Sequence, residues 1–385
     1  MKLEKRKILY YSATCGQASF TSINASVGTI YLLNKGFSVS ELSLYYAVFL
    51  ICSAICEYPS GVVADLLGRK KTYSLGSIML SVPYMAYTLQ ISLVDLLLVG
   101  AIGGVGEAMV SGSLEAWLLH KKNTEAIKVI SFGRSISKIV SILILVLLGS
   151  CSFNTNYVYY TLFYSSILLS LITFFTLKDN NYKKESDKNI VFYSISLFYK
   201  NKNVLLYSVI SALAIGSLSA YIIFWQLLSE KNGFVGSEKM YVNAISLTAA
   251  AISSLYYATM TNYRAIDRLV KNILLLGISG LFLLLVNNVF SFLLGVALFG
   301  FSMGIFFPLM YQVISESIDA DCKASLFSLS NFVGTVSAII CTLISGIVIE
   351  NAGITFCIYF TIVLLLIGYA VAVYNPLTRV RPEAP

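Results

Sequence analysis

Apolar runs of about 20 residues recur along the whole chain, and each is long enough to cross the roughly 30 Å hydrocarbon core of a bilayer. Of the 385 residues, 57% are hydrophobic and only 12% are charged. Soluble globular proteins carry about 25% charged residues. Because backbone groups in lipid must be hydrogen-bonded internally, such runs predict transmembrane helices. The sequence therefore argues against a soluble globular protein.

Charges, glycines and asparagines interrupt these runs and divide the chain into twelve predicted helices. An even number of spans places both termini on the same side of the membrane. We therefore expect an all-α polytopic membrane protein. The predicted ranges are 8–32, 41–64, 73–90, 92–119, 127–152, 158–177, 204–230, 239–262, 273–287, 290–318, 324–350 and 354–374.

Lysine and arginine predict the orientation of these helices. Of the 27 Lys and Arg residues, 22 fall in the tails and loops of one side and three on the other. The positive-inside rule places the richer side, with both termini, in the cytoplasm. The first residues, MKLEKRK, precede no small-residue cleavage site, so we expect a cytoplasmic tail of an inner-membrane protein. The net charge of +8 then reflects a face against anionic lipid, with no nucleic-acid partner.

The one long polar stretch of the chain lies midway, at residues 178–203. Six predicted helices precede it and six follow. We expect a six-helix bundle over 1–177, a cytoplasmic linker over 178–203 and a second bundle over 204–385. Two six-helix halves with inverted repeats are typical of secondary transporters, which bind their solute near the middle of the membrane.

The segment GVVADLLGRKK, at the predicted connection between the second and third helices, is a recognisable motif. It resembles the loop between helices 2 and 3 of the major facilitator superfamily at Gly61, Asp65, Gly68, Arg69 and Lys70. The resemblance extends to the 6+6 arrangement of the whole chain. The sequence departs from the family pattern at three points: a second arginine of this loop is absent, as are the helix 4 arginine and the antiporter signature of helix 5.

The resemblance implies that these five residues form a cytoplasmic gate. An ordinary positive-inside turn with a glycine cap accounts for Gly68 and the basic run. It does not account for Asp65, because a carboxylate at a helix C-terminus opposes the helix dipole. In the family this aspartate faces the N-terminal end of helix 11, near Ala324 here, and holds the cytoplasmic side closed. Gly61 is expected to allow a close approach between helices.

Five charged residues fall within predicted spans, where each requires a partner or a water-filled cavity. They are Glu57, Glu107, Glu115, Arg134 and Lys138. At ~1.5 Å per residue, Glu107 and Lys138 both lie about 16–18 Å from the cytoplasmic end. We predict a ladder of two pairs, Glu107–Lys138 and Glu115–Arg134. It is either a static ion-pair network or a proton and solute site, with Glu107 as the coupling residue and Glu57 as the second choice.

Further candidate solute contacts are polar or aromatic residues in predicted helices. The first helix is too polar to face lipid. For each residue, a hydrogen bond between helices is an equally good interpretation. The candidates are Gln17, Thr21, Asn24, Tyr221, Trp225, Gln226, Tyr311, Gln312 and Asn331.

The residue content argues against several other functions. The chain has one histidine and seven cysteines without metal-ligand spacing, so we expect no cofactor and no metal site. The glycine-rich segment GAIGGVGEAMVSG lacks the lysine of a phosphate-binding loop and is expected to allow close helix packing. A polytopic membrane enzyme would require catalytic residues near an interface and larger loops.

We therefore expect a secondary transporter, acting as a monomer in membrane lipid, with protons as the coupling ion. Both signs of charge in one cavity suit a small zwitterionic or amphipathic organic solute. The short loops and acidic residues resemble those of bacterial drug and natural-product exporters. That resemblance implies export of a drug, a peptide-type antibiotic or a siderophore; import of a small organic solute is the alternative.

Overall fold

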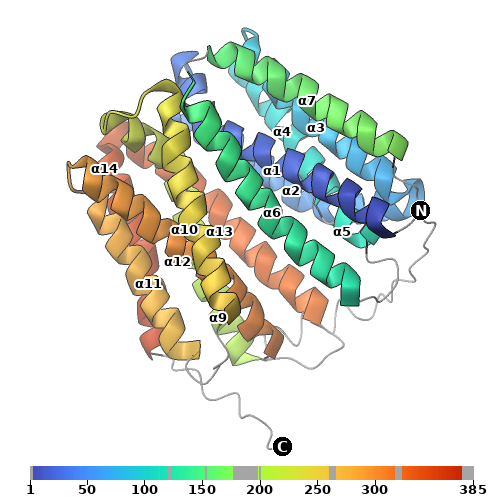
Figure 1. Cartoon of the computed structure of the whole chain (residues 1–385). Helices are drawn as coiled ribbons and strands as arrows, with labels where there is room; N and C mark the ends of the chain where they lie inside the picture. Colours follow the sequence, from blue (N-terminus) through green and yellow to red (C-terminus); the bar gives the residue numbers. More distant parts are fainter. Residues whose placement is uncertain are drawn as a thin grey trace, which may run out of the picture. The chain divides into compact units, whose positions relative to one another are not determined.

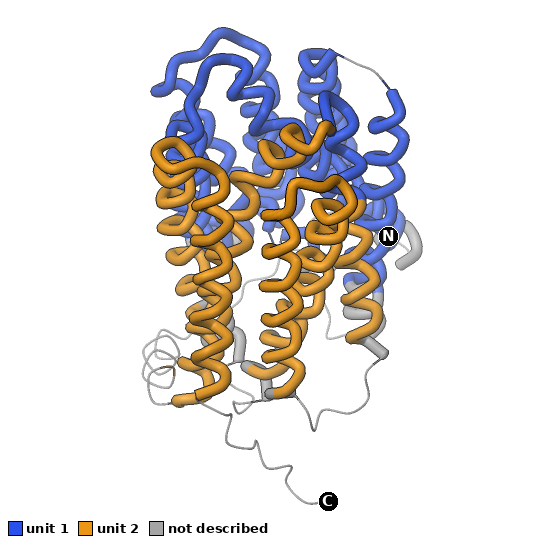
Figure 2. Tube along the Cα trace, turned by 90° about the vertical axis from the view of Figure 1, so that its left-hand side faces the viewer, with its two compact units in different colours: residues 1–185, 234–244 blue, residues 186–233, 245–385 orange. Residues whose placement is uncertain are grey.

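The structure is a computed structural model that describes residues 3–111, 113–118, 124–151, 154–176, 198, 201–259, 266–316 and 323–374. Its helices divide into two compact units, which Figure 2 colours separately. Unit 1 holds residues 1–185 and 234–244, and unit 2 holds residues 186–233 and 245–385. Each of the twelve predicted spans overlaps a described helix, which confirms the all-α prediction.

Unit 1 is built from seven helices and the first turns of an eighth (Figure 1). Helix α4 packs against α2 and α3, α3 packs against α7, and α1 packs against α6. The helices are α1 (Leu3–Asn34), α2 (Val39–Leu67), α3 (Arg69–Thr88), α4 (Leu93–Val110), α5 (Ser113–Leu118), α6 (Thr124–Gly149) and α7 (Thr155–Thr176), with η1 (Gly236–Glu238) and the start of α10 (Lys239–Thr259).

Unit 2 contains the remainder of α10 and five further helices. Helix α9 packs against α13 and α14, and α11 packs against α12 and α14. The ring of Tyr221 on α9 lies 4.7 Å from that of Phe299 on α12. The helices are α9 (Lys202–Lys231), α11 (Ile266–Leu283), α12 (Val289–Glu316), α13 (Lys323–Ala352) and α14 (Ile354–Tyr374).

Local sequence signals fix several helix ends. Ser38 accepts a hydrogen bond from the Glu41 amide, and the Glu41 carboxylate accepts one from the Ser38 amide, which together start α2. Ser92 and Asp95 form the same capping box at α4. Gly68 ends α2 with a φ of 96°, a backbone region that favours glycine, so α3 begins at the next residue.

Eight helices of the described residues are long and apolar enough to cross a membrane. Helix α1 is not among them, in agreement with its predicted polar character. The eight windows lie at Val39–Glu57, Leu93–Val110, Phe132–Gly149, Thr155–Thr176, Lys202–Lys231, Val289–Met310, Leu329–Ala352 and Ile354–Tyr374.

The glycines of α4 bring that helix close to its neighbours. A Cβ at Gly104 would lie 2.2 Å from the carbonyl oxygen of Phe49 on α2. A Cβ at Gly106 would lie 2.8 Å from the carbonyl oxygen of Gly76 on α3. Side chains are therefore excluded at these contacts, which confirms the prediction that the glycine-rich segment allows close helix packing.

Buried tyrosines join four helices of unit 1. The hydroxyls of Tyr45 on α2 and Tyr87 on α3 are hydrogen-bonded to each other. The ring of Tyr159 on α7 packs at a tilt against that of Tyr31 on α1, with centroids 4.6 Å apart. The Tyr159 hydroxyl also donates to the side-chain oxygen of Asn24, at 3.2 Å. Part of the high tyrosine content thus serves packing within this unit.

Candidate functional site

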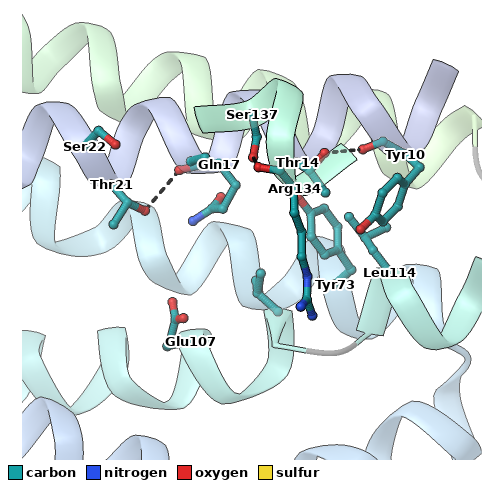
Figure 3. Close-up of a pocket in the computed structure, with 12 residues that line it drawn as sticks. Tyr10, Thr14, Gln17, Thr21, Ser22, Tyr73, Glu107, Leu114, Arg134 and Ser137 are labelled. Atoms are coloured by element: carbon teal, nitrogen blue, oxygen red, sulfur yellow. Dashed lines mark hydrogen bonds between the residues drawn. The ribbon is translucent and has the colours of Figure 1, made fainter. Parts of the chain in front are cut away.

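An open cavity of about 400 Å³ lies within unit 1 and is lined by residues of α1, α3, α4, α5 and α6 (Figure 3). Polar side chains lie toward one end and aromatic side chains toward the other. Its lining consists of Tyr10, Thr14, Gln17, Ala18, Thr21, Ser22, Tyr73, Glu107, Val110, Leu114, Arg134 and Ser137.

One face of α1 supplies the polar wall. Thr14, Gln17 and Thr21 follow one another at spacings of three and four residues and share a helix face, and Ser22 is adjacent to Thr21. Gln17 and Thr21, both predicted solute contacts, line the cavity. Asn24 does not line it and instead accepts the hydrogen bond from Tyr159. Thr14 and Ser22 were missed, although the three-residue spacing from Gln17 identifies Thr14.

The side-chain oxygen Oε1 of Gln17 is enclosed and has no hydrogen-bond partner in the structure. The Thr21 hydroxyl donates instead to the backbone carbonyl of Gln17, at 3.0 Å (Figure 3). An enclosed amide oxygen without a donor is unfavourable in the free protein. The Oε1 atom of Gln17 can therefore accept a further hydrogen bond.

Glu107 projects into the cavity from the last turn of α4, opposite Gln17 (Figure 3). Its side chain is exposed to the cavity although it lies within an apolar span. Tyr73 and Tyr84 of α3 lie within electrostatic reach of its carboxylate. A carboxylate inside a membrane segment requires such a polar space. Glu107 therefore lines the cavity, and its role as the coupling residue stays a prediction.

The structure does not show the first of the two predicted ion pairs, Glu107–Lys138. Among the described residues, no ion pair joins Glu107 to Lys138. Arg134 lines the cavity, whereas Lys138 is exposed elsewhere on α6. The side chain of Glu115 lies outside the described residues, so its pairing with Arg134 stays a prediction. Equal depth in the membrane was the basis of the prediction, and depth does not determine the direction in which a side chain points.

The fourth predicted span is interrupted one turn after Glu107. Helix α4 ends at Val110, Ser111 has an extended backbone (φ −55°, ψ 124°), and α5 begins at Ser113. The continuous helix predicted over 92–119 is therefore wrong. The spacing of four residues that would place Glu107, Ser111 and Glu115 on one helix face applies only to an unbroken helix, so it does not apply here.

The aromatic end of the cavity belongs to a buried cluster. Tyr10 of α1, Tyr73 of α3, Leu114 and Trp117 of α5 and Val129 of α6 pack together. Tyr10, Tyr73 and Leu114 also line the cavity. Sequence reasoning missed all three, since their pattern is that of ordinary buried residues.

The residues of the predicted cytoplasmic gate lie around the turn between α2 and α3. The turn at Gly68 is confirmed, and Arg69 and Lys70 begin α3. The Nζ atom of Lys70 lies 5.1 Å from the ring centroid of Phe174 on α7.

The Asp65 side chain lies outside the described side chains, so its role in the gate stays a prediction. No described heavy atom lies within 4 Å of a Cβ at Gly61, and the close helix approach expected there stays a prediction.

Glu57 is exposed on α2 and does not line the cavity. Several predicted solute contacts of unit 2 are buried: Tyr221, Trp225 and Gln226 are 6%, 5% and 2% exposed. Gln312 accepts a hydrogen bond from the Tyr257 hydroxyl.

Asn331 is exposed, and the side chain of Tyr311 lies outside the described residues. Roles in solute binding for the predicted contacts of unit 2 stay predictions. Within the described part of the chain, no three metal-ligating side chains come together.

Comparison with known proteins gives concordant results. The profile of the family described as Major Facilitator Superfamily matches residues 9–265. The uncharacterized MFS-type transporter YxaM of Bacillus subtilis strain 168 is 23% identical over 389 residues, which covers 93% of each chain.

Solved structures share the fold at low sequence identity. The nucleoside transporter NupG is 16% identical, with a TM-score of 0.75 over 97% of this chain and 98% of that one. A bacterial homologue of the human lysosomal transporter Spinster, in its inward-facing occupied form, is 14% identical, with a TM-score of 0.74 over 98% of this chain and 96% of that one.

Proposed function

Because the chain belongs to the major facilitator superfamily, a family of secondary transporters rather than enzymes, we propose that the cavity of unit 1 binds its transported solute. The observation that carries this proposal is that Glu107 and Arg134 line the same cavity. Charged side chains inside a membrane segment are costly and usually mark a solute or ion pathway. Two opposite charges around one space within a single unit are hard to explain by packing alone.

The arrangement of the lining favours a dipolar solute. Glu107 faces Gln17 at the polar end, where a protonated amine or a hydroxyl of the solute would donate hydrogen bonds (Figure 3). Arg134 lies beside Tyr73 at the aromatic end (Figure 3). A guanidinium binds carboxylate and phosphate groups in a bidentate manner and stacks on planar groups. The solute class is therefore a small zwitterion or amphipathic molecule with an anionic or planar end.

We assign proton coupling to Glu107. It is a titratable carboxyl that is exposed to the cavity inside an apolar span. Protonation removes its charge, and a neutral carboxyl binds a cationic group less strongly than a carboxylate does. Competition between a proton and the solute for one group is sufficient to couple their movements.

The direction of transport is a further part of the proposal. Export of a drug, a peptide-type antibiotic or a siderophore stays a prediction from the sequence, and import of a small organic solute is its alternative. The nucleoside transporter NupG shares the fold, so nucleosides belong among the solutes to be tested. We place the multi-pass chain in the cytoplasmic membrane, with both termini in the cytoplasm.

The test is exchange by the purified full-length chain in proteoliposomes under an imposed pH gradient. The external medium is a bacterial metabolite extract supplemented with nucleosides, and the internal solutes are identified by mass spectrometry. A transporter accumulates a dipolar solute in a gradient-dependent manner, relative to protein-free liposomes. The direction of solute movement is compared under the two opposite pH gradients, for protein whose orientation in the liposome membrane is known. This comparison distinguishes export from import. No gradient-dependent accumulation of any dipolar solute would contradict the proposal.

Replacement of Arg134 and of Lys138 should have very different effects. We expect Arg134→Gln to raise KM for the accumulated solute about tenfold to hundredfold, because a charge-assisted hydrogen bond contributes ~1.5–3 kcal/mol. Lys138→Gln removes an equal charge four residues away, outside the cavity, and should change KM less than about twofold. Initial rates of uptake against solute concentration measure both. Equal effects of the two substitutions would place the solute elsewhere on α6.

A further inference from the structure

The interruption of the fourth span, between Val110 and Ser113, removes backbone hydrogen bonds that a continuous helix would make. In an unbroken helix the carbonyls of Ala108 and Met109 accept from the amides four residues later. The extended backbone of Ser111 ends that pattern, after its own amide has bonded to the Glu107 carbonyl at 2.8 Å. Helix ends buried in apolar surroundings require other donors for such carbonyls.

Two serine hydroxyls act as donors at this point. Ser113, on the far side of the break, donates from Oγ to the carbonyl of Met109 at 2.6 Å. Ser60, on the neighbouring helix α2, donates from Oγ to the carbonyl of Ala108 at 2.9 Å. The single proton of Ser60 is shared with the carbonyl of Glu57, also at 2.9 Å. Both serines are buried, at 8% exposure for Ser60 and 5% for Ser113.

The break lies beside the cavity. Glu107 stays in the last turn of α4 with its carboxylate in the cavity, and Leu114 of α5 forms the adjoining wall. The carbonyls of Ala108 and Met109, which accept from the two serine hydroxyls, belong to the same last turn as Glu107. The two hydroxyls therefore hold the turn from which the Glu107 side chain projects.

We propose that Ser60 and Ser113 are positioning residues, whose hydroxyls hold the break and thereby keep the Glu107 carboxylate directed into the cavity. The inference rests on the proposed function in one respect, which is that Glu107 takes part in transport. Neither serine lines the cavity, so neither contacts the solute. Loss of both donors leaves two buried carbonyls unsatisfied and favours the continuous helix, which satisfies them with backbone amides.

The test uses the accessibility of position 107 and needs no solute. Glu107→Cys is introduced into the full-length chain after its seven cysteines are replaced, and a membrane-impermeant methanethiosulfonate reagent labels it in proteoliposomes. We expect Ser60→Ala with Ser113→Ala to lower the labelling rate about tenfold, since two buried acceptors lose their donors. Ser60→Thr with Ser113→Thr keeps both hydroxyls and should keep the rate.

Two controls separate positioning from a general loss of structure. Ser81→Ala removes a buried hydroxyl that bonds only within an unbroken part of α3, to the carbonyl of Ile78 at 2.7 Å, and should leave the rate unchanged. Thr21→Cys reports on the opposite wall of the cavity and should be labelled equally in all backgrounds. If the double alanine variant does not fold, each single variant serves, with an expected decrease of about threefold.

An unchanged labelling rate at position 107 in the alanine variants would overturn the inference. A fall that the threonine variants share would also overturn it, because the hydroxyls would not be the cause. Transport by Glu107→Gln is measured in parallel. If that variant transports as well as the natural protein, the proposed function fails, while the labelling result still decides whether the serines hold the break.

Discussion

Glu107→Gln lowers the pH-gradient-driven accumulation of the transported solute about a hundredfold. The substitution removes a charge-assisted hydrogen bond to the solute and leaves a side chain that cannot bind or release a proton. Glutamine preserves the size of the side chain and its hydrogen-bonding shape, so packing in the last turn of α4 is retained. Initial uptake by the purified chain in proteoliposomes measures the effect. Equal insertion and monodispersity of the variant show that the loss arises in transport.

Glu57→Gln is the matched control for this result. Glu57 is also an exposed carboxylate within a span, but it does not line the cavity. We expect its replacement to change accumulation less than about threefold, in line with loss of an exposed charge. The reverse outcome, with transport lost in Glu57→Gln and kept in Glu107→Gln, would place the pathway along α2 and contradict the cavity as the solute site.

Gly104→Val has the largest expected effect on stability. Its Cβ would lie 2.2 Å from the carbonyl oxygen of Phe49 and 3.0 Å from the amide nitrogen of Ser53, both backbone atoms of α2. Backbone atoms cannot move aside as a flexible side chain does, so α2 and α4 must separate. Overpacking of this kind costs ~1–3 kcal/mol or more. We expect a lower midpoint of thermal unfolding in detergent and a smaller yield of monodisperse protein.

Gly61→Ala controls for the general effect of replacing glycine in these helices. A Cβ at Gly61 meets no described heavy atom within 4 Å, and alanine favours a helix more than glycine does by ~1 kcal/mol. We expect an unchanged or slightly raised unfolding midpoint. A fall at Gly61 comparable to that at Gly104 would show that close packing is not the cause of the Gly104 effect.

The sequence predicted the helical fold well because lipid imposes a strong and simple rule. Only helices of sufficient length satisfy the backbone inside a bilayer, so hydropathy and charge locate the spans. Helix ends with local signals were also predictable, as at Gly68, where φ is 96°. The close packing of α4 followed from its glycines, since small residues at such a density have few other uses in an apolar helix.

The interior of unit 1 was less predictable, because it depends on interactions between helices. The break after Val110 is completed by Ser60, which is far away in the sequence. Arg134 and Lys138 lie one turn apart on the same face of α6, so the extent of the cavity along the helix decides that only Arg134 lines it. Asn24 was predicted as a solute contact, yet it bonds to Tyr159 of α7, which no local pattern indicates.

The most direct test of solute binding at Glu107 is a simultaneous record of solute and proton movement. Proteoliposomes containing an internal pH-sensitive dye receive the solute identified by exchange, with no gradient imposed. We predict that solute entry through the natural protein changes the internal pH, and that Glu107→Gln abolishes this proton flux. Solute movement without proton flux in the natural protein, or an undiminished proton flux in Glu107→Gln, would contradict the account.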